Sequence, residues 1–436
     1  MKISKLYIDE YKHLKDLNFD FTYPMDFHDE TMRGKPLNKI CFIGQSATGK
    51  TSLLELIFEN LKHLLELETI DNKYLFNLFG DSNLLKGELI LKLKNEELHY
   101  KNESITFNQN EFTFSKRNGQ LGKLIPLDLT NSLYYLKSSL ISDKNIELFS
   151  KNPIDLIEKN TVQIENIKIS KRNNKLKPQI LSFNDKVDES TWLFLICEIL
   201  DYRKNFTQKM SELIHKGLLA NTEKLSYEFK KWQKDNPNTL ELFAENFNPI
   251  LEKLNLEVDI IDTEYSIPIR NKTTDEIIPI QNTSTGTKGL LLSFLPLYKL
   301  DTKESIILID EPERSLYPDM QMDLMDYYQN LAPKAQFIIA THSPFIAASF
   351  EPCERFILYF DAEGKVAVRQ GTSPIGDDPN DILKNDFELE FLMNEKGRKA
   401  FERFRELKRK IATVDDEEEK DKLLDEILTL AKTYNF

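Results

Sequence analysis

An uninterrupted loop motif, Gly44-Gln45-Ser46-Ala47-Thr48-Gly49-Lys50-Thr51, matches the phosphate-binding pattern G-x-x-x-x-G-K-[ST] at every fixed position. Its glycines allow backbone N–H groups to turn inward around phosphate oxygens. Lys50 supplies a positive charge for the β- and γ-phosphates, and the Thr51 hydroxyl is a ligand for Mg²⁺. An apolar run at 39–43 precedes the loop and a helical pattern follows it, so the positive end of a helix points at the same anion. The motif therefore predicts a site for ATP and Mg²⁺.

Two carboxylates stand at the end of a second apolar run, Ser305-Ile306-Ile307-Leu308-Ile309-Asp310-Glu311-Pro312. The continuous apolar stretch is typical of a central strand that is buried on both faces. Carboxylates at the end of such a strand are costly unless they face a ligand site. We expect Asp310 to hold Mg²⁺, through water, and Glu311 to accept a proton from the attacking water.

A histidine follows a third apolar run, Phe337-Ile338-Ile339-Ala340-Thr341-His342-Ser343-Pro344. A neutral imidazole at this point can donate a hydrogen bond to the γ-phosphate and can position the attacking water. A histidine taken alone is more often a surface residue. Among the six histidines of the chain, however, His342 is the one at a predicted strand end with small polar neighbours. We therefore predict that His342 acts in catalysis together with Glu311 and Lys50.

A serine and a glycine precede a short predicted helix in the segment Gln281-Asn282-Thr283-Ser284-Thr285-Gly286-Thr287-Lys288. Backbone N–H groups at a helix N-terminus form an anion site, and a serine there is also a good N-cap. The segment taken alone is explained equally well as a simple helix cap. Its position between the phosphate loop and the acidic strand favours a role for Ser284 and Gly286 in nucleotide binding.

The elements that must position these residues divide the chain into four parts. Alternation of apolar and polar residues from Gly87 to Phe114 predicts an antiparallel β-subdomain. A stripe of apolar residues at helical spacing from Leu195 to Leu213 predicts helices between the motifs. We expect an N-terminal lobe of an ATPase head at 1–140, a helical insertion or arm at 141–255, a C-terminal lobe at 256–375, and a helical segment for partner binding or oligomerisation at 376–436.

The composition sets limits on location and partners. Three well-separated cysteines, Cys41, Cys197 and Cys353, have neither disulfide-framework nor metal-site spacing, which favours a reducing cytoplasm. No apolar run approaches the ~18 residues that a membrane span needs, so we expect no membrane association. The net charge of −13 argues against bulk coating of nucleic acid but allows a local basic groove.

The order of the four motifs resembles the layout of ABC-type ATPases. More narrowly, the chain is similar to the RecF/OLD-like group, whose patterns D-E-P-E-x-x-L-H-P and T-H-S-P are matched by Asp310-Glu311-Pro312-Glu313-Arg314-Ser315-Leu316-Tyr317-Pro318, with Gln321 after it, and by Thr341-His342-Ser343-Pro344. The resemblance implies an α/β fold: an ABC-type P-loop NTPase head with a mixed sheet core and an antiparallel β-subdomain, carrying a helical insertion and a C-terminal helical hairpin. It also implies hydrolysis of ATP to ADP and phosphate, and a head-to-head dimer or higher homo-oligomer. In that dimer, Ser284 and Gly286 would act in trans on the γ-phosphate held by the other copy.

The chain departs from the group's pattern in three places. Tyr317 stands where histidine is usual, and no acidic residue follows Gly286. The glutamine that normally follows the β-subdomain has no clear counterpart, with Gln109 and Gln120 as the candidates. This last departure affects the route from nucleotide to arm, not ATP binding.

The tail motif Gly376-Asp377-Asp378-Pro379-Asn380-Asp381-Ile382-Leu383 and the two helices after it resemble ATPases of bacterial anti-phage systems, Septu among them. In those systems the ATPase controls a separate nuclease or toxin, and we expect the same here. Two alternatives stay open: a DNA-repair ATPase of the RecF/SMC kind that acts on DNA, and a scaffold whose oligomer is locked by ATP. Basic residues within 168–177 and in the first tail helix make DNA a further candidate partner, although a solvated face is the more ordinary explanation.

Overall fold

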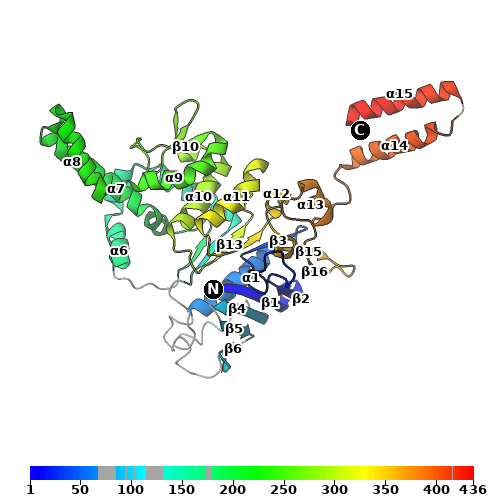
Figure 1. The fold of residues 1–436 in the computed structure, drawn as a ribbon, viewed down its shortest axis with the longest axis horizontal. Coiled ribbons are helices and arrows are strands. Elements are labelled where there is room, and N and C mark those ends of the chain that lie inside the picture. Colours follow the sequence, from blue (N-terminus) through cyan, green and yellow to red (C-terminus); the bar gives the residue numbers. More distant parts are fainter. Residues whose placement is uncertain (67–84, 94–95, 103, 114–130, 173–178, 415) are drawn as a thin grey trace.

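The computed structural model describes residues 1–436 except 67–84, 94–95, 103, 114–130, 173–178 and 415. The described chain forms a body of two large sheets, a small sheet and surrounding helices (Figure 1). The helical hairpin at the C-terminal end stands apart from this body, and helices α7 and α8 project from the opposite side (Figure 1). Among the described residues, none of the helices combines the length and the apolar character needed to cross a membrane.

A seven-stranded core sheet carries the three apolar runs. Its order is β16 (Val366–Gln370), β15 (Arg355–Phe360), β3 (Lys39–Gly44), β14 (Gln336–Ala340), β13 (Ile306–Asp310), β8 (Leu133–Leu136) and β9 (Ile180–Phe183). All neighbouring pairs are parallel except β15 with β16. Every residue of β13 and β14 is buried, as the continuous apolar runs predict. Because the strands are parallel, the loops after β3, β13 and β14 meet at one edge of the sheet.

A second, antiparallel sheet contains the predicted β-subdomain. Its order is β2 (Leu14–Asp20), β1 (Lys2–Tyr11), β4 (Lys86–Leu93), β5 (Glu96–Lys101), β6 (Ser104–Phe107) and β7 (Asn110–Thr113). Helix α1 (Lys50–Glu66) follows the phosphate loop, and its apolar side chains share one buried core with strands of both large sheets. This shared core holds the phosphate loop between the two sheets.

The segment between the lobes is mostly helical. Its helices are α4 (Asp143–Glu147), α5 (Pro153–Lys159), α6 (Thr161–Arg172), α7 (Glu189–His215), α8 (Thr222–Asp235) and α9 (Thr239–Leu251). The outer part of α7 pairs with α8 through an aromatic cluster of Tyr202, Phe206, Phe229 and Trp232, with ring centroids 5.9–6.4 Å apart. This pair forms a short arm.

The segment 141–255, predicted to be a helical insertion, also contains a strand. Strand β9 lies inside it and joins the core sheet as an edge strand, where it runs parallel to β8. Its Phe183 is fully buried and packs on Trp192 at the start of α7, with ring centroids 5.6 Å apart. The insertion is therefore tied to the core sheet by a strand too short to show a period in the sequence.

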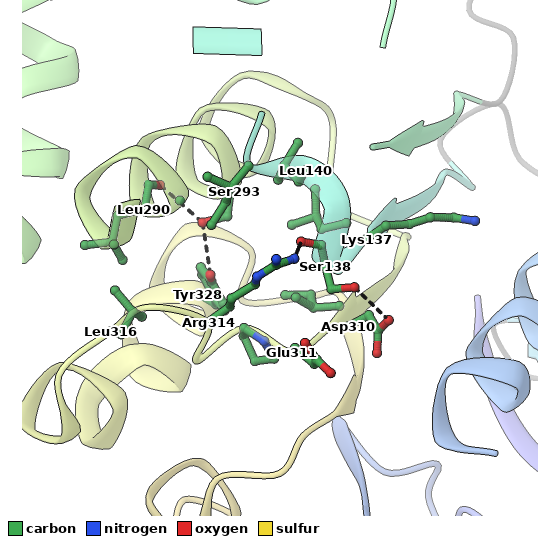
Figure 2. A pocket seen from close by; sticks show the side chains of 16 residues that line it. Lys137, Ser138, Leu140, Leu290, Ser293, Asp310, Glu311, Arg314, Leu316 and Tyr328 are labelled. Carbon is green, nitrogen blue, oxygen red and sulfur yellow. Dashed lines mark hydrogen bonds between the residues drawn. The ribbon is translucent and has the colours of Figure 1, made fainter. Parts of the chain in front are cut away.

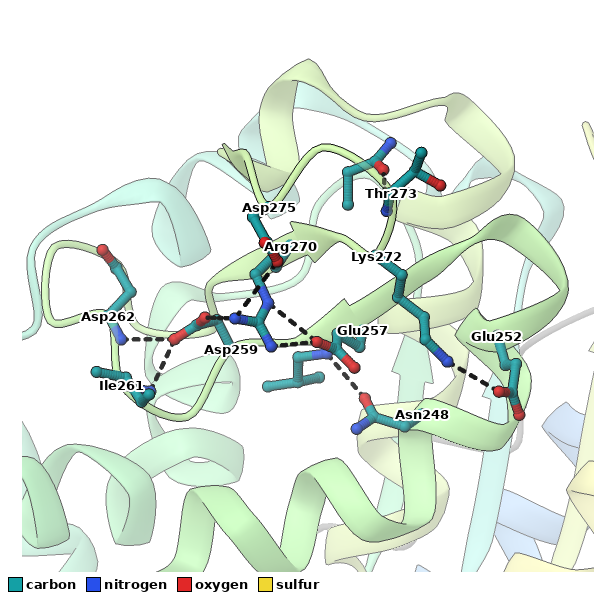
Figure 3. Close-up of polar contacts among 12 residues, drawn as sticks. Asn248, Glu252, Glu257, Asp259, Ile261, Asp262, Arg270, Lys272, Thr273 and Asp275 are labelled. Atoms are coloured by element: carbon teal, nitrogen blue, oxygen red, sulfur yellow. Dashed lines mark hydrogen bonds and ion pairs between the residues drawn. The ribbon is translucent and has the colours of Figure 1, made fainter.

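A small sheet of β10 (Leu256–Val258), β11 (Ile269–Asn271) and β12 (Ile277–Ile278) follows α9. Arg270 holds it together by ion pairs with Glu257, with Asp259 at 3.5 Å and with Asp275 at 3.9 Å (Figure 3). The side-chain oxygen of Asn248 on α9 accepts a hydrogen bond from the N–H of Val258 at 2.8 Å. These contacts fix the start of the second lobe against the helical insertion.

The second lobe is completed by helices and ends in a hairpin. Its helices are α10 (Thr285–Lys299), α11 (Pro318–Leu331), α12 (Pro344–Ala347) and α13 (Pro379–Asn385), followed by α14 (Glu395–Ile411) and α15 (Glu417–Tyr434) of the hairpin. The hairpin has a small core of its own around Phe404, Leu407, Leu423 and Ile427. The predicted fold class is confirmed: an α/β head with a mixed core sheet, an antiparallel β-subdomain, a helical insertion and a C-terminal helical hairpin.

A fully buried ion pair anchors the base of the tail. Arg355 on β15 and Asp386 at the end of α13 approach to 2.9 Å, and both side chains have 0% exposure. Arg355 also donates to the carbonyls of Ala347, at 3.1 Å, and Phe350, at 2.8 Å, next to α12. Asp386 accepts from the N–H of Thr372 at 2.9 Å. The pair thus joins the helix after His342 to the segment that leads into the hairpin.

Asp386→Ala is expected to destabilise the protein by about 3–5 kcal/mol, because it leaves the buried Arg355 charge without its counter-charge. The measurement is the midpoint of urea unfolding, followed by circular dichroism. The matched control is Glu388→Ala, which removes the exposed partner of Arg369 at 2.8 Å. A surface pair contributes only about 0–1 kcal/mol, so the control should unfold close to the wild-type midpoint. Equal midpoints for the two variants would contradict this account.

Candidate active site

The phosphate loop runs from the end of β3 to the first turn of α1. Gly44 has φ 139°, and a Cβ at this position would lie 2.0 Å from the carbonyl oxygen of Leu358. Gly49 has φ 94°, and a Cβ there would lie 2.7 Å from the imidazole of His13. Both positions require glycine, because a side chain would meet strain and a clash. The loop therefore has the shape that the sequence pattern predicts, with the N-terminus of α1 facing into it.

Lys50 lies folded over this loop. Its Nζ donates to the carbonyl oxygens of Gly44 and Gln45, each at 2.9 Å, and the residue is only 6% exposed. Burial lowers the pKa of Lys50 to about 8, although the nearby charges of Asp310 and Glu311 act in the opposite direction. A buried cation beside the N-terminus of a helix is stabilised by an anion. The geometry and charge of the loop thus fit a polyphosphate.

Thr51 and Asp310 meet beside the loop although they are far apart in the sequence. The Thr51 hydroxyl lies 3.1 and 3.2 Å from the two carboxylate oxygens of Asp310. Asp310 is 5% exposed, and burial is the main cause that raises its pKa to about 6. A carboxylate whose charge is disfavoured by burial gains from a cation, and hydroxyl and carboxylate oxygens are the ligands that Mg²⁺ prefers. The residues present therefore fit Mg²⁺.

Glu311 lies directly after β13 and lines the same pocket as Asp310 (Figure 2). Its φ is 51°, in the left-handed region, and its N–H donates to the carbonyl oxygen of Ala340 at 2.9 Å. This conformation costs a residue other than glycine about 1–3 kcal/mol and is concentrated at functional sites. The chain therefore turns away from the direction of β13 at Glu311, while the hydrogen bond to Ala340 keeps the backbone of Glu311 attached to β14.

His342 is held by the segment that follows Glu311. Its backbone N–H donates to the Glu313 carboxylate at 2.8 Å. The next residue, Ser343, donates to Gln321 at 2.5 Å, and Gln321 in turn donates to the carbonyl oxygen of Leu316 at 2.8 Å. The turn after β14 and the turn after β13 therefore form one bonded unit.

The surroundings of His342 favour its neutral form. Loss of hydration, reinforced by the positive charge of Lys50, lowers the pKa of the imidazole, although the side chain as a whole stays exposed. Burial raises the pKa of Glu313 above its ordinary value. A neutral imidazole with one N–H is the form that can donate to a phosphate oxygen without a full charge.

The Ser-x-Gly segment begins α10. Ser284 is the N-cap, and its hydroxyl accepts from the N–H of Thr287 at 3.1 Å. A Cβ on Gly286 would lie 2.5 Å from the carbonyl oxygen of Ser315, so the glycine allows α10 to pack on the segment after Glu311. The cap function is present within one copy of the chain. The role of Ser284 and Gly286 toward a second copy stays a prediction.

Sequence reasoning missed several residues that contact the site. Glu313 and Gln321 were noted only as part of a motif, and their contacts with the His342 turn depend on the packing of β13 beside β14. Gln109 lies in the exposed turn between β6 and β7, and Gln120 lies outside the described residues. Ser138, two residues after the end of β8, lies 3.4 Å from Asp310. The apolar run of β8 was the available signal for it, since a polar residue just after a buried parallel strand lies at the same sheet edge.

The structure describes the tail helix but not the side chains of the other basic region. The basic side chains of the 168–177 cluster lie outside the part of the chain that the structure describes. In the tail, Arg403 pairs with Glu426 and Lys410 with Glu419, each at 2.9 Å. Part of the basic charge of α14 is therefore neutralised by α15.

The chain is similar to several known proteins. A family model described as an AAA ATPase domain matches residues 1–347. The Septu protein PtuA of Bacillus thuringiensis is 36% identical over 72 residues, which span 16% of this chain and 18% of that relative's length. The Smc head domain of Pyrococcus furiosus, solved with an extended coiled coil, is 15% identical with a TM-score of 0.38 and covers 85% of this chain and 96% of that one. The SMC head domain from Thermotoga maritima is 11% identical with a TM-score of 0.42 and covers 86% and 100%.

Proposed function

The chain belongs to the family of AAA ATPase domains, and from this premise we propose that it hydrolyses ATP to ADP and phosphate. One observation supports this most strongly. The Thr51 hydroxyl lies 3.1 Å from the Asp310 carboxylate, in the same site as the buried Lys50 amine. These are the hydroxyl, the carboxylate and the cation that a Mg²⁺–nucleotide complex requires.

The proposed mechanism assigns one task to each residue. The backbone N–H groups of the phosphate loop and Lys50 hold the β- and γ-phosphates. Thr51 and Asp310 hold Mg²⁺, which when bound neutralises negative charge on the phosphoryl oxygens. Glu311 accepts the proton of the attacking water, and neutral His342 donates to the γ-phosphate. The bonded unit of Glu313, Gln321 and Ser343 keeps the His342 turn in place.

We further propose that two copies close head to head around the nucleotide. The N-terminus of α10, with Ser284 as its cap, provides N–H groups for a γ-phosphate held by the second copy. This arrangement follows from the family resemblance, and light scattering with and without ATP tests it.

The ATPase is proposed to control a separate nuclease or toxin in anti-phage defence. The match to the Septu protein PtuA and the C-terminal hairpin set apart from the head support this assignment. The hairpin leaves Leu424 and Leu428 of α15 44% and 53% exposed, as a surface for a partner requires.

Affinity purification of the tagged protein from its own host, with mass spectrometry and nucleic-acid detection, is expected to recover a nuclease or toxin. The control is the same chain without α14 and α15, residues 395–436, whose loss should release the partner. DNA recovered without any protein partner would instead favour an ATPase that acts on DNA. Recovery of the chain alone, in an ATP-dependent oligomer, would favour the scaffold.

A further inference from the structure

A serine at the start of the helical insertion reaches the proposed ATP site. Strand β8 lies beside β13, and Leu136 at its end pairs with Ile309. The chain then continues through Lys137 and Ser138 at the sheet edge where Asp310 lies. The Ser138 hydroxyl donates to the Asp310 carboxylate at 3.4 Å, on the opposite side of the strand order from β14 (Figure 2). Asp310 is thus approached by hydroxyls from two elements, Thr51 on α1 and Ser138 after β8.

The backbone of Ser138 is fixed by the turn that carries the proposed base. Arg314 donates from Nη1 to the carbonyl oxygen of Ser138 at 2.6 Å (Figure 2). Arg314 lies three residues after Glu311 and next to Glu313, which binds the backbone of His342. Movement of the Glu311 turn would therefore displace the backbone of Ser138.

The same loop leads into the insertion. Ser138 opens a short 3-10 turn, Ser138–Leu140, and Ile141 follows it. A Cβ on Gly289 of α10 would lie 2.8 Å from Ile141, so the loop packs closely on the helix that begins with Ser284. Helix α4 starts directly afterwards at Asp143. Residues 137–141 thus contact Asp310, the Glu311 turn and α10 before the chain enters the insertion.

We propose that Ser138 is a positioning residue that orients Asp310 toward Mg²⁺ and connects nucleotide occupancy to the helical insertion. This inference rests on the proposed ATPase function. It assigns to a serine on this loop the coupling task for which the sequence offered Gln109 and Gln120. Gln109 lies far along the β-subdomain, in the turn between β6 and β7. Ser138, by contrast, follows β8 closely, and its hydroxyl donates directly to Asp310.

The test compares Ser138→Ala with its neighbour Ser139→Ala and with Ser138→Thr, which keeps the hydroxyl. Mg²⁺ is titrated into the protein with a fluorescent ATP analogue, and binding is read from fluorescence. Loss of a hydrogen bond to a charged group should raise the Mg²⁺ concentration at half-saturation of Ser138→Ala by about tenfold or more. Ser138→Ala should bind nucleotide in EDTA as wild type does and should unfold at the wild-type midpoint. Ser139→Ala should keep the wild-type Mg²⁺ affinity, and Ser138→Thr should recover most of it.

Limited proteolysis of the same proteins tests whether nucleotide binding changes the conformation of the helical insertion. Mg²⁺ and ATP are expected to change the cleavage pattern within 141–255 in wild type and Ser139→Ala, and much less in Ser138→Ala. Ser138→Ala with both readouts at wild-type values would overturn the inference and leave the ATPase proposal intact. A wild-type protein that shows no Mg²⁺-dependent nucleotide binding would overturn both.

Discussion

Lys50→Ala is expected to abolish nucleotide binding. Lys50 is the buried cation of the phosphate loop, and its Nζ lies 2.9 Å from the carbonyl oxygens of Gly44 and Gln45. Each hydrogen bond to a charged group contributes about 1.5–3 kcal/mol, so the loss of contacts to two phosphates weakens binding by at least ~100-fold. Isothermal titration calorimetry with ATP and Mg²⁺ measures this directly.

The matched control is Lys62→Ala. Lys62 lies on the same helix, α1, and pairs with Glu59 at 3.9 Å on the protein surface. Its removal should leave ATP affinity unchanged, since it is not part of the loop. Circular dichroism of both variants shows whether α1 stays folded. Tight ATP binding by a folded Lys50→Ala protein would refute the assignment of the phosphate loop.

Glu311→Gln is expected to retain ATP binding and to slow turnover by ~10²–10⁴, the usual contribution of a general base. The amide has the shape of the carboxylate but cannot accept the proton of the attacking water. Because φ of Glu311 is 51° and glutamine meets the same backbone limits as glutamate, the turn itself should be preserved. Phosphate release under single-turnover conditions separates the chemical step from binding.

Glu59→Gln on the exposed side of α1 is the control for this variant, and its turnover should equal that of wild type. Light scattering adds a second readout. If ATP closes two heads on each other, Glu311→Gln should trap the dimer, because the nucleotide that bridges the copies is no longer removed. Wild-type turnover in Glu311→Gln would show that another residue is the base. An unchanged mass with and without ATP would contradict the head-to-head dimer, not the assignment of Glu311.

The sequence by itself determined the parts of the site that depend on a few consecutive residues. The phosphate loop could be recognised because its glycines, Lys50 and Thr51 act through local backbone geometry. Asp310 and His342 could be recognised because each ends a run of apolar residues, and polar groups at the ends of buried parallel strands gather at one sheet edge. The fold class followed from the same runs and from the family resemblance.

Only the tertiary structure decided which distant residues meet. Thr51 and Asp310 are 259 positions apart in the sequence. They come together because β3 and β13 run parallel and only β14 separates them, so the ends of the two strands lie close together. Strand order also brings Ser138 to Asp310, and the packing of α13 on α12 places Asp386 beside Arg355. The short strand β9 joins the insertion to the core sheet without a periodic signal of its own. The physical reason is common to all four: periodicity reports which face of an element is buried, whereas the partner across that face is selected by the packing of the whole chain.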